Sequence, residues 1–342
     1  MSEPSISVLI PTRNRAHTLR LTIQAMQRQT APYTELIVGD DASEDNTCET
    51  VAEFRDERIQ YIRHQKNLGI YGNWNDLIAR ATGDYICIYH DHDCYLPHIL
   101  DNSRRILDTH PDVAFVHTAL LFIDSTDAVV NADVRPFAAV TPGSEMRAML
   151  ARDWHSPIMA ATVMARREAY REAGPYHPER YGLGCDKHMW FEMSRLGDVG
   201  YVAEPQALIR MRERGSGTAQ FDWANEWGML RMRVEQTAAA FAQDPEAYIE
   251  AARSLRRETS TRFLTRAVRA LLLEPPEAWA REEEKVISVL GPVERALYRA
   301  MRNSASLQKL AANVALPLHY RRIARQLESA RKTAKEFEHG RI

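Results

Sequence analysis

The chain has 342 residues, of which 45% are hydrophobic and 26% charged, and its 44 basic and 46 acidic side chains leave a formal net charge of −2. A chain of this length can bury a full core without disulfide or metal staples, and its balanced charge excludes a global electrostatic preference for nucleic acid. The four cysteines have neither zinc-binding spacing nor the density of a secreted disulfide framework, so we expect a cytoplasmic protein. The sequence has no run of about 18 apolar residues, which a membrane-spanning helix would need, and its first residues do not have the pattern of a secretion signal.

The first 130 residues alternate short apolar runs with amphipathic segments, a pattern typical of a parallel sheet flanked by helices. Expected strands cover Ile6–Ile10, Glu35–Val38, Ile59–Arg63 and Tyr85–Tyr89, and expected helices cover Thr18–Gln29, Thr47–Phe54 and Gly69–Ala81. Ligands of such sheets bind beyond the carboxyl ends of the strands. The loops after Ile10, Val38 and Tyr89 are therefore the candidate site.

The rest of the chain divides into a continuation of the sheet and a helical region. Later strands are expected at 113–116, 120–123, 162–164, 201–203 and 208–211, with a helix at 166–173. Past about Gln220 glycine becomes rare, apolar residues recur at three- and four-residue steps, and prolines divide the segment into four or five expected helices. We therefore predict a domain at 1–218, with one half at about 1–130 and another at about 131–218, followed by a helical region at 219–342.

The last predicted helix, Tyr320–Glu338, is basic and amphipathic. Two interpretations remain open for it. A solvated helix that packs one apolar stripe on its neighbours is favoured, and attachment to an anionic membrane surface is the alternative. The second interpretation would place the protein at the inner face of the plasma membrane.

Polar residues follow the first two expected strands. Pro11, Thr12 and Arg13 begin the first loop, which suits an anionic or nucleotide ligand. Asp40 and Asp41 follow the second strand, where a base or ribose could be bound through hydrogen bonds. Helix N-capping explains acidic residues later in that loop, but it does not explain two adjacent carboxylates at a strand end.

The clearest chemical pattern is the stretch from residue 90 to residue 93, His-Asp-His-Asp. Asp91 and Asp93 are hard oxygen ligands that suit Mn²⁺ or Mg²⁺, which would also bind diphosphate oxygens. A zinc site formed by His90, His92 and His98 is the alternative. If the segment is extended, alternation directs the histidines away from the carboxylates, so the acidic pair is favoured.

Together these loops resemble those of the inverting glycosyltransferase family 2, whose members have the GT-A fold. The resemblance covers about residues 5 to 215 and keeps the family's order and spacing. The matching stretches are Ser7–Arg15, Glu35–Ser43, Asp45–Thr47, Asn67–Gly69, Asn73–Asn75, Thr82–Tyr85, Asp91–Asp93 and Leu96–Pro97. The resemblance implies a Rossmann-like, mostly parallel α/β sheet flanked by helices, with the C-terminal helices as an appendage. It also implies that the half at about 1–130 binds the donor and the half at about 131–218 the acceptor.

The resemblance also implies roles for individual residues. Asp41 corresponds to the carboxylate that pairs with the nucleotide base, and Asp91 and Asp93 correspond to the metal-binding pair. Arg212 and Arg214 stand where the family often has a histidine that contacts the diphosphate. The implied nucleotide-sugar site consists of Pro11, Thr12, Arg13, Asp40, Asp41, Asn67, Asp91, His92, Arg212 and Arg214.

The segment Gly182–Trp190 resembles the family's acidic segment at the start of a helix on the acceptor side, which makes Asp186 the expected general base. Cys185 replaces the family's usual glutamate there. The implied mechanism is a single in-line displacement, in which Asp186 takes the proton of an acceptor hydroxyl while that oxygen attacks the anomeric carbon.

The expected function is transfer of a sugar from a UDP- or dTDP-linked donor to a glycan, lipid-linked or small-molecule acceptor, in cell-surface polysaccharide or glycoconjugate synthesis. The partners expected are therefore the donor and the acceptor, with a homodimer as a further expectation. A nucleotidyltransferase would need a loop rich in glycine and lysine after the first strand, and a dinucleotide dehydrogenase a Gly-x-Gly-x-x-Gly turn; the sequence has neither. A non-catalytic nucleotide-sugar-binding protein on the same fold remains the alternative from another class.

Overall fold

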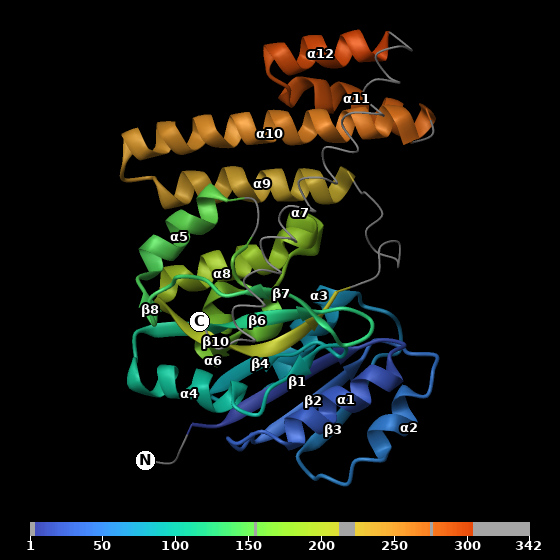
Figure 1. The fold of residues 1–342 in the computed structure, drawn as a ribbon, viewed down its shortest axis with the longest axis vertical. Coiled ribbons are helices and arrows are strands. Elements are labelled where there is room, and N and C mark those ends of the chain that lie inside the picture. Colours follow the sequence, from blue (N-terminus) through green and yellow to red (C-terminus); the bar gives the residue numbers. More distant parts are fainter. Residues whose placement is uncertain (1–3, 154–155, 212–222, 274–275, 304–342) are drawn as a thin grey trace. The chain divides into compact units, whose positions relative to one another are not determined.

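The structure is a computed structural model that describes residues 4–153, 156–211, 223–273 and 276–303. The described residues fall into two compact units, one up to residue 211 and one from residue 223 to residue 303 (Figure 1). The predicted boundary at 218 and the division into donor and acceptor halves stay predictions. Among the described residues, no helix is long and apolar enough to cross a bilayer.

Ten strands form one mixed sheet within the described residues of the first unit. Eight of them lie in the order β3-β2-β1-β4-β9-β6-β10-β5, and the other two, β7 and β8, pair with β6 and β10. The parallel half consists of β1 (Ile6–Thr12), β2 (Glu35–Asp40), β3 (Ile59–Arg63) and β4 (Tyr85–Ile88). The other half consists of β5 (Cys94–Tyr95), β6 (Val113–Ile123), β9 (Met164–Arg166) and β10 (Asp198–Arg210), with β7 (Val129–Asp133) and β8 (Val140–Thr141) beside it. The expected α/β sheet is confirmed.

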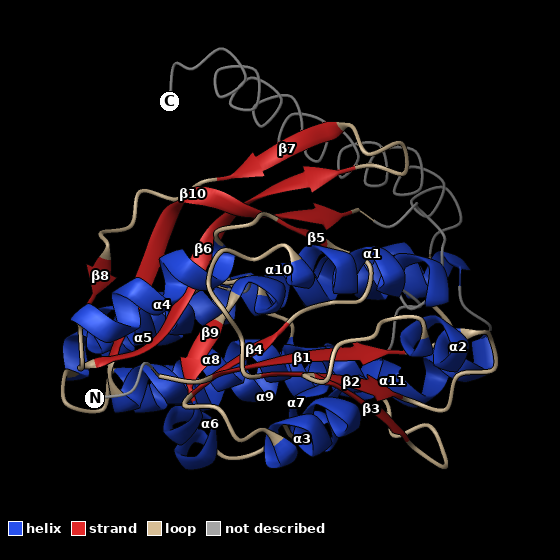
Figure 2. Cartoon of the chain, turned by 90° about the horizontal axis from the view of Figure 1, so that it is seen from below, coloured by secondary structure: helices blue, strands red, loops and turns tan. Residues whose placement is uncertain are grey.

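Helices cover both faces of the sheet. The helices α1 (Ala16–Gln27) and α4 (Ile99–Thr109) lie on one face, and α3 (Ile70–Arg80), α6 (Arg167–Ala173) and α8 (Cys185–Leu196) lie on the other (Figure 2). The remaining elements of this unit are α2 (Thr47–Ala52), α5 (Gly143–Arg152), α7 (Pro178–Tyr181) and the 3₁₀ turns Ala160–Thr162 and Gly182–Gly184. Sequence periodicity missed α4 and α5.

The later strands differ from the expectation in two ways. The segments expected at 113–116 and 120–123 form the single strand β6, and those expected at 201–203 and 208–211 belong to the single strand β10. The register of β10 against β6 shifts between Val202 and Ala207, and Pro205, which has no N–H to donate, lies inside this irregularity. The shift interrupts the alternation of buried residues, which is why β10 looks like two strands in the sequence.

The packing of α3 on the parallel half depends on Gly39 in β2. A Cβ atom at Gly39 would lie 2.5 Å from the Oδ1 atom of Asn73 and 2.8 Å from Leu77. The side-chain amide of Asn73 donates to the carbonyl oxygen of Gly39 at 2.7 Å. This close approach holds the first turns of α3 beside the strand that leads into Asp40 and Asp41.

The second unit consists, in the part from 223 to 303 that the structure describes, of α9 (Trp223–Ala240), α10 (Pro245–Leu273), α11 (Pro276–Val289) and α12 (Pro292–Arg302). Three of these helices begin at proline, which suits a first helical position because its missing N–H would have no intrahelical partner. Inside the unit Trp227 packs on Phe263 with ring centroids 4.8 Å apart. The basic helix expected at Tyr320–Glu338 lies outside the described residues.

Burial of His117 in β6 gives the fold a specific dependence on pH. Its ring packs against Tyr201 and Phe137, and its Nε2 atom is buried without a hydrogen-bond partner. Burial, with a smaller contribution from the charge of Arg135, lowers the pKa of His117 to about 3. The unfolded chain therefore binds a proton below about pH 6.5 that the folded chain rejects, and stability falls as the pH decreases.

We expect His117→Phe to remove this dependence, because phenylalanine keeps an aromatic ring and cannot titrate. Between about pH 7.5 and about pH 5, the free energy of unfolding of the wild type should fall by about 2 kcal/mol more than that of the variant. Urea denaturation at both pH values measures the difference. Equal pH slopes for the two proteins would show that His117 is not held neutral in the fold.

Candidate active site

The loops after β1 and β2 are joined to each other at the carboxyl edge of the parallel strands. Asn14 and Ala42 have left-handed backbones, with φ values of 53° and 59°. The backbone N–H of Asn14 donates to Ser43 Oγ at 2.9 Å, and Asn14 Oδ1 accepts the N–H of Glu44 at 2.7 Å. Non-glycine residues keep such conformations where their surroundings fix them, so these loops form a rigid floor for the site.

The adjacent residues Asp40 and Asp41 have different partners. Asp40 is buried and accepts hydrogen bonds from the N–H of Ser43 at 2.8 Å and from the hydroxyl of Tyr61. Asp41 accepts the backbone N–H groups of Leu68 at 2.6 Å and Gly69 at 3.0 Å. Asp40 therefore closes its own loop, whereas Asp41 fixes the segment that begins α3. Each Asp41 oxygen keeps a lone pair for a further donor.

Other residues expected to bind the nucleotide lie around these two loops. Thr12 is buried, whereas the side chain of Arg13 is exposed and Pro11 is partly buried. Asn67 is exposed, and its Oδ1 atom accepts the N–H of Gly69 at 2.8 Å. Arg212 and Arg214 lie outside the described residues.

Asp91 is buried and joins the loop after β1 to the loop after β4. Its carboxylate accepts hydrogen bonds from the Thr12 hydroxyl at 2.7 Å and from Arg15 at 2.9 Å, and its Oδ1 atom lies 2.9 Å from Nδ1 of His92. Burial alone would raise the pKa of Asp91. The hydrogen bonds and the Arg15 charge outweigh burial and lower it, so Asp91 stays ionised.

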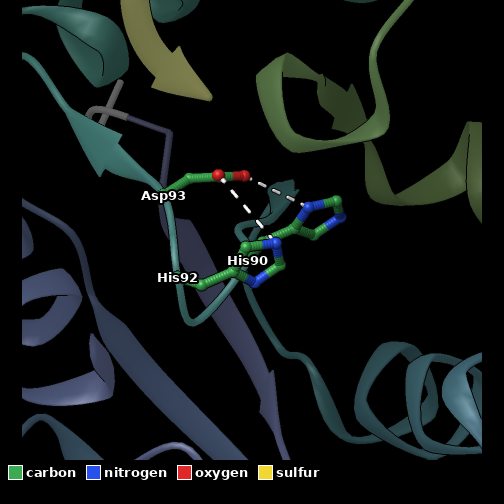
Figure 3. A group of neighbouring side chains, drawn as sticks. All are labelled: His90, His92 and Asp93. Carbon is green, nitrogen blue, oxygen red and sulfur yellow. Dashed lines mark ion pairs between the residues drawn. The ribbon is translucent and has the colours of Figure 1, made fainter. Parts of the chain in front are cut away.

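The side chains of His90, His92 and Asp93 converge, as Figure 3 shows. Their potential ligand atoms all lie within 4.8 Å of one another. Nδ1 of His90 is 3.3 Å from Asp93 Oδ2, and Nε2 of His92 is 4.0 Å from Asp93 Oδ1. The expectation that alternation separates the histidines from the carboxylates is wrong, because Asp91 and His92 form a turn instead of an extended strand. His98 is exposed and hydrogen-bonded to Thr30, and it is not part of this cluster.

Arg210, at the end of β10, holds this turn from the other half of the sheet. Its backbone N–H donates to Asp93 Oδ1 at 2.9 Å, and its Nε donates to the carbonyl oxygen of His92 at 3.3 Å. Its guanidinium also forms an ion pair with Asp127. One oxygen of Asp93 is thereby satisfied, while the other, Oδ2, is buried without a hydrogen-bond partner.

Asp186 is the second residue of α8. Its Oδ1 atom accepts the N–H of Lys187 at 2.7 Å. The surrounding protein atoms desolvate the carboxylate and raise its pKa above the usual value, and this effect exceeds the opposing interactions with the Lys187 N–H and with the charge of His90. A carboxylate with a raised pKa is a stronger base. The charge of His90 acts on this carboxylate, so Asp186 lies within electrostatic range of the turn at 90–93.

An aromatic wall connects α3 to the segment before α8. Tyr71 stacks on Tyr176 with ring centroids 5.4 Å apart, and Trp74 packs edge-on against Tyr176 at 5.2 Å and lies 5.8 Å from His90. The side-chain amide of Asn75 exchanges two hydrogen bonds with the backbone of Tyr176, at 2.9 and 3.0 Å. These contacts fix the position of α8, and so of Asp186, against the turn.

Four residues of this arrangement were missed as site residues in the sequence. Arg15 lies in the polar stretch after β1, and Tyr71 is three residues before Trp74 on the same face of α3, so both carried a weak signal. Tyr176 and Arg210 reach the site only through tertiary packing, which no local pattern reveals.

The chain is similar in sequence to known glycosyltransferases. Residues 7–174 match the sequence profile of Glycosyl transferase family 2. The putative glycosyltransferase EpsE of Bacillus subtilis is 29% identical over 216 residues, which cover 62% of this chain and 74% of that protein. An Escherichia coli protein, the UDP-Glc:alpha-D-GlcNAc-diphosphoundecaprenol beta-1,3-glucosyltransferase WfgD, is 32% identical over 101 residues, 30% of this chain and 40% of that protein.

A solved structure shares the fold. The crystal structure of S. aureus TarS 1-349 in complex with UDP-GlcNAc superimposes with a TM-score of 0.63 and 17% sequence identity, covering 98% of this chain and 92% of that one. On the family profile and its glycosyltransferase relatives, the chain contains a glycosyltransferase family 2 domain.

Proposed function

We propose that this protein is an inverting, metal-dependent glycosyltransferase that moves a sugar from a UDP- or dTDP-linked donor to an acceptor hydroxyl. One observation carries the proposal: a carboxylate with a raised pKa, Asp186, lies beside a turn with a convergent set of metal-ligating side chains, at the edge of the sheet where the β1 and β2 loops end. A displacement at an anomeric carbon needs a base on one side and charge neutralisation at the leaving group on the other.

The donor would lie along the ends of β1, β2 and β4. Asp41, Asn67 and the segment Pro11–Arg13 provide hydrogen-bonding groups for the base and ribose. The diphosphate would then reach the turn at 90–93, where Arg15 adds a cation. The relative WfgD is named for a UDP-linked donor, which supports a uridine nucleotide here as well.

The residues at the turn fit a divalent cation. Asp93 Oδ2 is buried without a hydrogen-bond partner, and two imidazole rings face the same carboxylate. Both oxygens of Asp91, the other predicted ligand, already accept hydrogen bonds from Thr12 and Arg15. When bound, Mn²⁺ or Mg²⁺ would neutralise the negative charge that develops on the departing diphosphate.

Asp186 is the proposed general base. It accepts the proton of the acceptor hydroxyl while the hydroxyl oxygen forms a bond to the anomeric carbon and the bond to the diphosphate oxygen breaks. Attack from the face opposite the leaving group inverts the anomeric configuration. The raised pKa of Asp186 favours this proton transfer.

The biological setting is also part of the proposal. WfgD is named for an acceptor linked to diphosphoundecaprenol. This supports a lipid-linked or glycan acceptor and a role in cell-surface polysaccharide synthesis. A cytoplasmic location, including the inner face of the plasma membrane, and a homodimer stay predictions. A non-catalytic binding protein would leave Asp186 without a role as a base, and a nucleotidyltransferase would need the loop rich in glycine and lysine that the sequence lacks after β1.

The first prediction concerns Asp41. Asp41→Asn keeps an acceptor for the segment at 68–69 but weakens the hydrogen bonds that a carboxylate makes, so we expect UDP affinity to fall about tenfold while turnover at saturating donor stays within a few-fold. Asp56→Asn is the control, since Asp56 likewise accepts a backbone N–H, from Arg58 at 3.0 Å, away from these loops. Calorimetric titration with UDP that gives wild-type affinity for Asp41→Asn would remove Asp41 from the nucleotide site.

The second prediction concerns Asp186. Asp186→Asn should lower turnover by roughly 10² to 10⁴ with donor affinity within a few-fold of wild type, because a base acts only on the acceptor's proton. Its melting temperature at neutral pH should not fall. A carboxyl group whose pKa is raised in the fold destabilises the fold as the pH rises through its unfolded pKa, and the loss is complete above its folded pKa; asparagine lacks this charge.

The matched control is Glu192→Gln on the same helix, where Glu192 pairs with Arg195 on the surface. This variant should turn over like the wild type. Retained turnover in Asp186→Asn would eliminate Asp186 as the base, and lost donor binding would make it a donor ligand instead.

A further inference from the structure

We propose that the metal ion is held by His90, His92 and Asp93, and that Asp91 positions His92 instead of binding the ion. The site then selects a first-row transition-metal ion, such as Mn²⁺, Co²⁺ or Zn²⁺, over Mg²⁺. The inference rests on the proposed function and assigns this chain's own ligands within it.

The first support is the convergence of unpartnered atoms on one point. Asp93 is 1% exposed, and its Oδ2 atom lacks a hydrogen-bond partner. Nδ1 of His90 lies 3.3 Å from that oxygen. An uncompensated buried carboxylate is unfavourable, and a cation between Asp93 and the two imidazoles would compensate it.

The spacing agrees with an ion at the centre of the three side chains. Ligand atoms that each lie about 2.1 Å from one ion are about 3 to 4.2 Å apart. The 3.3 Å from His90 Nδ1 to Asp93 Oδ2 falls in this range, and so does the 4.0 Å from His92 Nε2 to the other oxygen of the same carboxylate, Oδ1. The complete set, within 4.8 Å, needs only a small rotation of a side chain to close around the ion.

The orientation of His92 gives the second support. Its Nδ1 atom lies 2.9 Å from Asp91 Oδ1 and 3.0 Å from a guanidinium nitrogen of Arg15, and its Nε2 atom lies 4.0 Å from Asp93 Oδ1. A histidine that binds a metal through one ring nitrogen usually donates the N–H of the other to a carboxylate, which fixes the tautomer and the ring plane. Asp91 is itself fixed by Thr12 and Arg15, so that both of its oxygens already accept hydrogen bonds.

The ligand types determine the selectivity. Mg²⁺ prefers six oxygen ligands in strict octahedral geometry, whereas imidazole nitrogen suits the first-row transition metals. Two imidazoles and one carboxylate leave positions open for diphosphate oxygens and water. The three ligands therefore suit a softer ion and leave coordination positions that the donor's diphosphate could occupy.

The test measures the bound ion without turnover. In the metal-stripped full-length chain, calorimetry should show Co²⁺ or Mn²⁺ binding at least about tenfold more tightly than Mg²⁺. His90→Phe and His92→Phe keep aromatic rings but remove the nitrogens, and each should weaken Co²⁺ binding by about tenfold or more. His98→Phe is the matched control and should bind Co²⁺ like the wild type. Near-UV circular dichroism checks that each variant is folded.

Pulsed electron paramagnetic resonance of bound Mn²⁺ separates the two aspartates. Coupling to directly bound imidazole nitrogen should be present in the wild type and in Asp91→Asn, and weaker in His92→Phe. A wild-type spectrum without nitrogen coupling, or unchanged Co²⁺ affinity in both histidine variants, would overturn the inference. If either result is obtained while sugar transfer still requires a metal, the inference about the ligands fails and the proposed function survives. If nitrogen coupling is present but no acceptor receives a sugar, only the proposed function is rejected.

Discussion

The carboxylate of Asp91 joins two loops that follow different strands, and the geometry of the site depends on this junction. It accepts hydrogen bonds from Thr12 and Arg15 on the β1 side and lies 2.9 Å from His92 on the β4 side. Because β1 and β4 are parallel neighbours, their ends meet at one edge, and a buried ionised group there needs partners from both loops. The junction places His92 toward Asp93, so the strand order of the sheet determines which groups can meet an ion.

Two carboxylates of the site have opposite electrostatic environments. Hydrogen bonds and a cation lower the pKa of Asp91, whereas burial raises the pKa of Asp186. Burial and, to a smaller extent, the nearby charge of Asp186 also raise the pKa of Tyr71. The Tyr71 hydroxyl therefore stays protonated, and it donates to the Leu183 carbonyl at 3.2 Å. When their surroundings shift the pKa values of two carboxylates in opposite directions, one carboxylate can stay ionised in a structural role while the other accepts a proton.

Much of the fold followed from the sequence, because apolar strands and amphipathic helices alternate with regular spacing up to β4. The later sheet was harder, since β10 contains a register shift and α4 was not recognised. In the site, the loops were located correctly from strand ends. The orientation of His92 was not predicted correctly, because Asp91 and His92 form a turn, in which side chains do not alternate as they do along a strand. Contacts such as that of Arg210 with Asp93 join residues 117 positions apart, which only the folded chain reveals.

The most direct test of the proposed activity is the configuration of the product. The metal-stripped protein would be incubated with UDP-α-hexoses and lipid-linked or glycan acceptors, with and without added Mn²⁺, and proton NMR would identify the anomeric signal of the transferred sugar. We expect metal-dependent release of UDP together with a β-linked product, as a single displacement requires. A product that retains the α configuration, or UDP-sugar binding without release of UDP under any of these conditions, would contradict an inverting transferase that uses Asp186 as its base.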